Sequence, residues 1–257
     1  MFGFSEQQIM AWLSPIIWPF LRTLAMFSVA PIFSQRAIPA RAKVAMAFVI
    51  ALGAQATLID QPVVSINSPD ALGTVLQQVG VGLAIGFAAR LAIAAMEVAG
   101  ELVGLQMGLN FASFFDPVSN AQLSAISRFL VQIFTLLFVA INGHLVVLMA
   151  VVNSFEAFPV NGHFMQAVSQ MRIHELGSAI FSSALWIALP MMALLLFVNL
   201  TMGIISRIAP QMNIFAVGFP VTLTVGMLGI TATLPMMEQP LLRLFEQTLG
   251  VFGAVSF

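Results

Sequence analysis

Six long apolar blocks divide the sequence, and they constrain its fold more than any other feature. They cover residues 9–33, 44–59, 71–95, 128–152, 178–205 and 214–237. Most are long enough for a helix of about 20 residues, the length that crosses a bilayer. Because 60% of the chain is hydrophobic and only 7% is charged, a soluble domain of this length could not bury its apolar surface. The sequence therefore predicts an all-α, polytopic membrane protein that forms a single subunit over residues 1–257.

Prolines inside the blocks predict kinked or broken helices. Pro15, Pro19 and Pro31 lie in the first block, and Pro190 lies in the fifth. A proline in a helix interior removes one backbone hydrogen bond and clashes with the preceding turn. The second block is short for a full crossing. The third block has glycines at the GxxxG spacing, which is typical of close helix contacts but weak as a motif.

Polar residues are too few and too scattered to predict a catalytic or metal site. The chain has no cysteine, which excludes disulfides and thiolate-bound metals. His144 has no second ligand at helical spacing, so a structural, hydrogen-bonded histidine is the favoured interpretation. The net charge of −1 argues against a nucleic-acid partner. We expect no catalysis, no cofactor and no metal.

Basic residues set the expected orientation. The densest cluster, Arg36, Arg41 and Lys43, follows the first block and marks the cytoplasmic side. With six crossings, most other basic residues outside the membrane fall on the same side, and both termini lie outside the cytoplasm. The residues on the cytoplasmic side are Arg36, Arg41, Lys43, Arg90, Arg128 and Arg207, against Arg172 and Arg243 on the other.

The central segment, residues 97–117, is neither a clean span nor a polar loop. Gly100, Gly104 and Gly108 repeat every four residues and would form a smooth stripe on a helix. Glu97 and Glu101 lie one turn apart beside this stripe, and such like charges repel unless partners or water are near. Residues 116–117, Asp-Pro, are expected to end the helix. The pattern fits a tight interface or constriction and an ordinary packed helix end equally well.

Charged residues within or beside the apolar blocks are candidates for a buried role or a subunit contact. Arg22 lies inside the first block, where it must face protein or water. Arg90 precedes Glu97 by seven residues, so the two could pair or could each meet a neighbouring subunit. The candidates for a subunit interface or buried charge are Arg22, Arg90, Glu97, Gly100, Glu101 and Gly104.

The tail, residues 238–257, alternates leucines and a phenylalanine with Arg243, Glu246 and Gln247. This pattern predicts a short amphipathic helix. We expect it to lie on a membrane or on a partner.

Five segments occur in the order and approximate spacing of a known family. They are PIFSQRAIPARAK at 31–43, GELVGLQMGLNFASFFDP at 100–117, NGH at 142–144, SRIAPQMNIF at 206–215 and VGFPVTLTVG at 217–226. On these segments the chain resembles the FliR family of flagellar export-gate proteins, which has relatives in type III secretion injectisomes. The resemblance covers nearly the whole chain, and the pattern favours the flagellar branch.

The resemblance implies a non-catalytic subunit of a helical export gate in the bacterial inner membrane at the flagellar basal body. Its implied partners are FliP-like and FliQ-like subunits and an FlhB-like export switch protein, and unfolded secreted proteins pass through as cargo. Much of such a subunit lies above the bilayer plane on the periplasmic side. The family also implies an internal pore plug, which here maps to Met107, Gly108, Leu109, Asn110, Phe111, Ala112, Ser113, Phe114, Phe115 and Asp116, and ends at Pro117.

An apolar constriction excludes water and ions yet yields to a passing chain, so the phenylalanines of this segment suit a plug. The alternative is a self-sufficient transporter of a small solute or proton. Its polar path would use Arg22, Arg90, Glu97 and Glu101. A transporter works when reconstituted alone, whereas a gate subunit does not.

Overall fold

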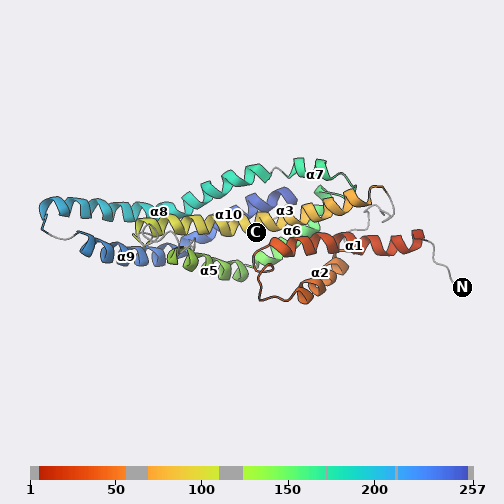
Figure 1. Cartoon of the computed structure of the whole chain (residues 1–257), viewed down its shortest axis with the longest axis horizontal. Coiled ribbons are helices and arrows are strands. Elements are labelled where there is room, and N and C mark those ends of the chain that lie inside the picture. The colour runs from red at the N-terminus through yellow and green to blue at the C-terminus, as the bar shows by residue number, and fades with distance from the viewer. Residues whose placement is uncertain (1–5, 56–68, 110–123, 172, 212–213, 254–257) are drawn as a thin grey trace, which may run out of the picture. The chain divides into compact units, whose positions relative to one another are not determined.

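The computed structural model describes residues 6–55, 69–109, 124–171, 173–211 and 214–253, and every regular element in these ranges is helical. The four longest helices are α1 (Glu6–Val29), α3 (Ala71–Gln106), α8 (Ile173–Ile208) and α9 (Ile214–Thr233) (Figure 1). The shorter ones are α2 (Ala40–Gln55), α5 (Ala125–Ala140), α6 (Gly143–Ala157), α7 (Phe164–Gln170) and α10 (Glu238–Leu249), with 3-10 turns η2 (Leu234–Met237) and η3 (Gly250–Phe252) on either side of α10. The predicted all-α fold class is confirmed.

Among the described residues, four helical stretches are long and apolar enough to cross a membrane. They are Met10–Val29, Ala71–Gln106, Leu176–Ile208 and Ala216–Met237. The pair α5 and α6 adds a fifth if its two halves, bent by 65°, form one span. We expected six crossings. The number of candidate spans is lower than six because α2, with only 16 residues, is too short to count as one.

The observed break in the fourth apolar block lies at an asparagine and not at a proline. Asn142, which precedes α6, has a left-handed φ of 59°, a conformation that asparagine tolerates better than most residues. Pro15 and Pro19 lie within α1, which runs without interruption to Val29. Pro190 likewise lies inside α8. The bilayer-length helices therefore accommodate Pro15, Pro19 and Pro190, whereas α1 ends at Val29, two residues before Pro31.

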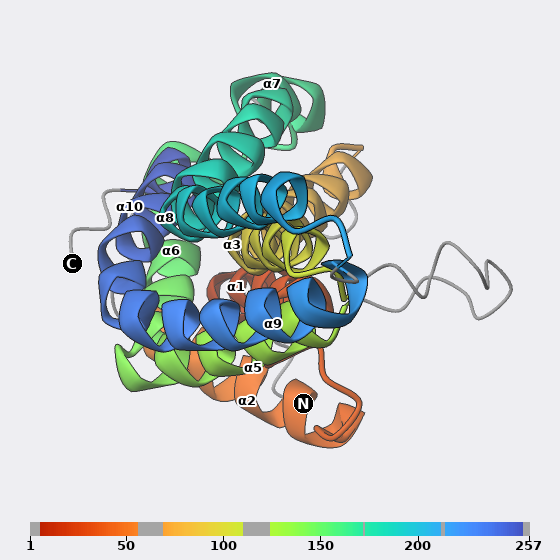
Figure 2. The same cartoon turned by 90° about the vertical axis from the view of Figure 1, so that its left-hand side faces the viewer.

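The chain folds into two compact units. Unit 1 comprises Met1–Leu91, Phe138–Gly177 and Phe245–Phe257, and unit 2 comprises Ala92–Leu137 and Ser178–Leu244. Helix α3 contributes its first half to unit 1 and its second half to unit 2. Within unit 2, α8 lies alongside the second half of α3 (Figures 1 and 2).

In unit 1, α3 meets α1 at two glycines four residues apart. A Cβ atom added at Gly82 would collide with the carbonyl oxygen of Arg22. One added at Gly86 would lie 2.8 Å from the carbonyl oxygen of Met26. Only glycine permits backbones to approach so closely. The GxxxG spacing of the third block is therefore a helix contact inside the chain.

Arg22 lies at the centre of unit 1 and is completely buried. Its Nε donates to Oε1 of Gln78 at 2.9 Å, and its two terminal nitrogens donate at 2.8 Å to Oγ of Ser154 and to the carbonyl oxygen of Phe158. The guanidinium also stacks 3.6 Å above the centroid of the Phe155 ring. These groups come from α3, from α6 and from the turn after α6. Arg22 thus joins three helices through neutral acceptors and one aromatic face.

The C-terminal helix α10 is amphipathic, as expected, but its apolar face is covered by the chain itself. Leu241, Leu244, Phe245 and Leu249 are all fully buried. In unit 1, the ring centroid of Phe245 lies 5.0 Å from that of Phe138. The expectation that this face contacts a membrane or a partner was wrong, because an apolar stripe shows only that a helix needs a cover and not which surface supplies it.

Candidate functional site

Helix α3 ends at the first residues of the expected plug, and a glycine ends it. The backbone N–H of Gly108 donates to the carbonyl of Leu105 at 3.1 Å, and that of Leu109 donates to the carbonyl of Gly104 at 3.1 Å. Gly108 has a left-handed φ of 81°. This pair of bonds around a left-handed glycine is a Schellman motif. We expected residues 116–117 to end the helix, but Gly108 ends it earlier and so lies outside the helical stripe.

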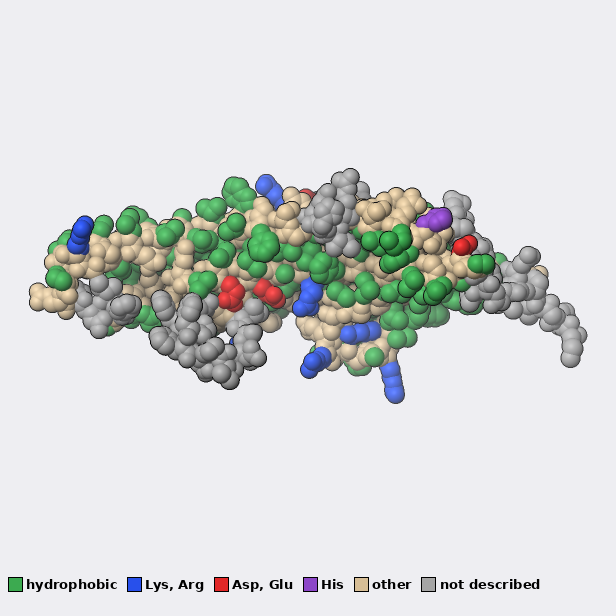
Figure 3. Space-filling view, turned by 45° about the horizontal axis from the view of Figure 1, so that its top comes forward, with side chains coloured by type: hydrophobic (Ala, Val, Ile, Leu, Met, Phe, Trp, Pro, Cys, Tyr) green, Lys and Arg blue, Asp and Glu red, His purple; other side chains and the backbone are tan. Residues whose placement is uncertain are grey.

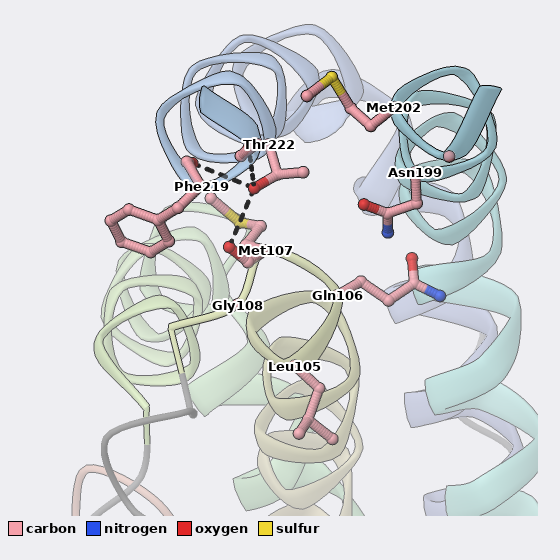
Figure 4. A pocket seen from close by; sticks show the side chains of 10 residues that line it. Leu105, Gln106, Met107, Gly108, Asn199, Met202, Phe219 and Thr222 are labelled. Carbon is pink, nitrogen blue, oxygen red and sulfur yellow. Dashed lines mark hydrogen bonds between the residues drawn. The ribbon is translucent and has the colours of Figure 1, made fainter. Parts of the chain in front are cut away.

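Met107, beside this glycine, attaches the helix end to α9. Met107 is fully buried, and its side chain fills the space above Gly226, where a Cβ atom would lie 2.7 Å from the sulfur. The hydroxyl of Thr222 lies 3.2 Å from the carbonyl oxygen of Met107 and shares its proton with carbonyls of its own helix (Figure 4). The first residue of the expected plug is therefore held in place by the packing of α3 against α9.

The residues that follow the plug segment are also attached to α3, through a capped helix start. Ser124 precedes α5, and its Oγ accepts the backbone N–H of Ser127 at 3.1 Å. The backbone N–H of Ser124 donates to Oε1 of Glu101 at 2.6 Å. A serine N-cap and a carboxylate at a helix N-terminus both stabilise the helix. Glu101 therefore caps α5 from the neighbouring helix, which accounts for one of the two carboxylates.

Gly100 lies where α3 and α5 are closest. A Cβ atom at this glycine would lie 2.5 Å from Cα of Ser127, and Oγ of Ser127 donates to the backbone carbonyl of Glu97 at 2.9 Å. Gly104, one turn further along, is also buried. Of the two interpretations left open by the stripe, the structure shows a tight helix contact at Gly100, and that contact is within the chain.

Together these contacts define the plug base: Glu101, Met107, Gly108, Ser124, Ser127, Thr222 and Gly226, all in unit 2. Of the predicted plug residues, Met107, Gly108 and Leu109 belong to the end of α3. Asn110, Phe111, Ala112, Ser113, Phe114, Phe115 and Asp116 lie outside the described residues, as does Pro117. Leu109 and Ser124, the described residues on either side of this gap, are both bonded to the last turns of α3.

A pocket of ≈ 470 Å³ adjoins the plug base in unit 2. Its lining combines apolar groups with two amides, those of Gln106 and Asn199, which lie on the same side of the pocket (Figure 4). Oε1 of Gln106 is buried and has no hydrogen-bond partner among the described residues. The full lining is Leu105, Gln106, Met107, Gly108, Asn199, Met202, Gly203, Gly218, Phe219 and Thr222.

The charges proposed for a transport path have different surroundings. Arg22 is buried and bonded to neutral groups, whereas Arg90 is exposed. Glu97 is half-buried. Glu101 is bonded to a backbone amide at the start of α5. In unit 2, therefore, one carboxylate of the suggested path stabilises a helix end.

In the described part of the chain, no three histidine, aspartate or glutamate side chains cluster as metal ligands would. His144 is half-buried, and its Nδ1 is buried without a hydrogen-bond partner among the described residues. The expected hydrogen bond of this histidine is therefore not made through Nδ1.

Sequence reasoning did not identify Ser124, Ser127 or Thr222 as part of the site. Ser124 carries a recognisable signal, because a serine immediately before an apolar run is a common helix N-cap. Thr222 carries none. Its partner Met107 is 115 residues away in the sequence, and nothing local indicates that contact.

Comparison with known proteins gives the family of the chain. Residues 13–248 match the family described as "Bacterial export proteins, family 1". The chain is 38% identical over 253 residues to the flagellar biosynthetic protein FliR of Escherichia coli strain K12, covering 98% of this chain and 96% of that protein. The FliR protein of Pectobacterium carotovorum subsp. carotovorum is 36% identical over 260 residues, covering 99% of this chain and 97% of that protein. The FliR protein of Bacillus subtilis strain 168 is 28% identical over 233 residues, covering 90% of this chain and 90% of that protein. The chain therefore belongs to family 1 of the bacterial export proteins, with the flagellar biosynthetic protein FliR as its relative over almost the whole length.

Proposed function

We propose that this chain is a non-catalytic core subunit of the flagellar type III protein export gate. It forms part of the channel for unfolded flagellar proteins, and its residues 107–116 contribute a plug inside that channel. The observation that carries the proposal is the plug base. Met107, Leu109 and Ser124, the described residues on either side of positions 110–123, are all fixed by contacts at the end of α3. In the proposal, the three phenylalanines between them obstruct the channel.

The proposed partners are FliP-like and FliQ-like subunits, together with an FlhB-like export switch protein. Exposed apolar surface on α8 and α9 supports the need for such partners. In the 18-residue apolar window of each span, only 28% of the residues are buried within the chain for Leu176–Ile208 and 22% for Ala216–Met237, against 67% for Ala71–Gln106. Surfaces so apolar are covered by lipid or by other subunits. In this proposal the gate lies in the inner membrane at the basal body, and part of it extends above the bilayer on the periplasmic side.

The plug is tested by removing its aromatic bulk in the assembled complex. We expect Phe111→Ala, Phe114→Ala and Phe115→Ala together to leave the complex intact and to raise its ion conductance, because smaller side chains no longer close the constriction. Conductance is measured across planar bilayers containing the purified complex. The matched control is Phe181→Ala, which removes an exposed ring from α8 and should leave conductance unchanged. Equal conductance in the triple variant and the unmodified complex would refute the plug assignment.

A further inference from the structure

Helix α2 has its small side chains inside and its large apolar ones outside. Its buried residues are Ala47, Ala51 and Ala54. The outward side chains include Phe48 and Val49, which are 48% and 66% exposed, together with Val44 and Leu52. A helix of a water-soluble protein would bury the large side chains instead. Packing on small residues with large apolar residues outside is typical of helices that face lipid.

The N-terminal end of this helix carries a cluster of cations. Arg36 and Arg41 are exposed and Lys43 is half-buried, and the sequence of α2 contains no acidic residue. Figure 3 shows lysine and arginine side chains gathered at the lower centre of the view, over α2 and the turn before it. Cations in the first turn oppose the helix dipole. Their place is therefore not explained by the stability of α2.

The position of the cluster relative to the candidate spans suggests what these cations meet. The span in α1 ends at Val29, and the basic turn follows it within a few residues. Positive side chains just beyond the end of a span lie at the level of the lipid headgroups. With 16 residues, α2 is about 24 Å long and too short to cross the roughly 30 Å hydrocarbon core. From the level of the headgroups, α2 can therefore enter only one leaflet of the bilayer.

We infer that α2 and the turn before it form a docking surface for anionic phospholipids. Arg36, Arg41 and Lys43 contact the phosphate groups, and the outward face around Phe48 and Val49 contacts the acyl chains. The charges are complementary, and the apolar face continues directly from the cationic end. This inference uses only unit 1 and is independent of the plug.

The chain has no cysteine, so a single label can be placed without altering the background. We would attach a bimane fluorophore through Val49→Cys in the complex that copurifies with the full chain. The complex is then reconstituted in mixed bilayers of phosphatidylglycerol and phosphatidylcholine, in which either one lipid or the other is brominated, and quenching by the two lipids in competition is compared. The binding preference for phosphatidylglycerol should exceed that for phosphatidylcholine by at least about fivefold, since one cation near an anionic surface contributes about that factor.

The matched variants locate the source of the preference. Arg36→Gln, Arg41→Gln and Lys43→Gln together should reduce the preference to near unity, while Arg207→Gln, which removes an exposed cation at the end of α8, should leave it unchanged. Equal quenching by both lipids in the unmodified chain would overturn the inference. Absence of quenching by either lipid would also overturn it, because a protein partner would then cover α2. Both outcomes are read from the unmodified surface, so they do not depend on the folding of the triple variant.

Discussion

At the residue scale, Arg22 shows how a cation can be held in an apolar core without an acidic partner. Its three donated hydrogen bonds end on an amide, a hydroxyl and a backbone carbonyl, and its planar face lies on Phe155. A buried charge is costly unless it is well bonded. The planar fork of arginine satisfies acceptors from several helices at once, and a lysine ammonium could not reproduce that geometry. Arg22 is therefore a structural cross-link of unit 1.

Arg22→Lys should destabilise the protein markedly because at least one buried acceptor loses its donor. We expect a loss of about 3 kcal/mol, in the range of one to two hydrogen bonds to a charged group. Thermal unfolding of the purified complex, followed by tryptophan fluorescence, measures this loss, since Trp18 lies in the same hydrophobic cluster as Phe155. The control is Arg90→Lys at an exposed position, which should change stability by less than about 0.5 kcal/mol. Equal effects of the two substitutions would contradict the role given to Arg22.

At the element scale, helix ends and glycine contacts fix the described residues on either side of the proposed plug. A Schellman motif ends α3, a serine cap begins α5, and Gly100 lets the two helices touch between these points. Local chemistry in the sequence accounts for part of this arrangement, because a glycine at the end of an apolar helix is a common stop. We interpreted Gly108 as part of the stripe, although its place after the last apolar turn also fits a helix end. The contact with Thr222 could not be predicted, because it depends on how α9 returns to α3.

Gly100→Ala should force α3 and α5 apart, since the added Cβ would lie 2.5 Å from backbone and not from a flexible side chain. We expect a destabilisation of about 1–3 kcal/mol, as for other overpacked contacts. The loss is measured as a lower unfolding temperature and a lower yield of intact complex. Gly177→Ala is the matched control, because that glycine, also helical, has open space around its Cβ position and alanine favours the helix. A variant at Gly100 as stable as the one at Gly177 would show that the contact is not tight.

At the scale of the whole molecule, the exposed apolar surface shows what must surround the chain. Trp186 and Phe197 on α8 are each 70% exposed, although α8 is among the most apolar helices of the chain. Exposed apolar area of this extent is costly in water. The chain therefore needs lipid, neighbouring subunits or both around unit 2. Lipid alone would meet this requirement for a self-sufficient transporter, whereas a gate subunit needs neighbouring subunits as well.

The chain reconstituted alone should transport neither protons nor small solutes, and its recovery should rise severalfold when FliP-like and FliQ-like subunits are coexpressed. The reason is that these subunits would cover the apolar faces of α8 and α9. Size-exclusion chromatography and proton flux into liposomes measure the two effects. A stable, monodisperse single chain with proton or solute flux would support the transporter and would direct attention to Arg22, Arg90, Glu97 and Glu101.

The sequence by itself determined the membrane class, the helical fold and the approximate place of each long helix, because composition and helical periodicity are local properties. Only the tertiary structure decided what each apolar or polar group meets. Arg22 bonds with residues 56, 132 and 136 positions away. Glu101 caps α5, whose first residue is 24 positions further along, and α10 buries its apolar face in its own chain. A local pattern specifies which face of a helix needs a cover, but the packing of distant helices chooses the cover, and that choice is a property of the folded chain as a whole.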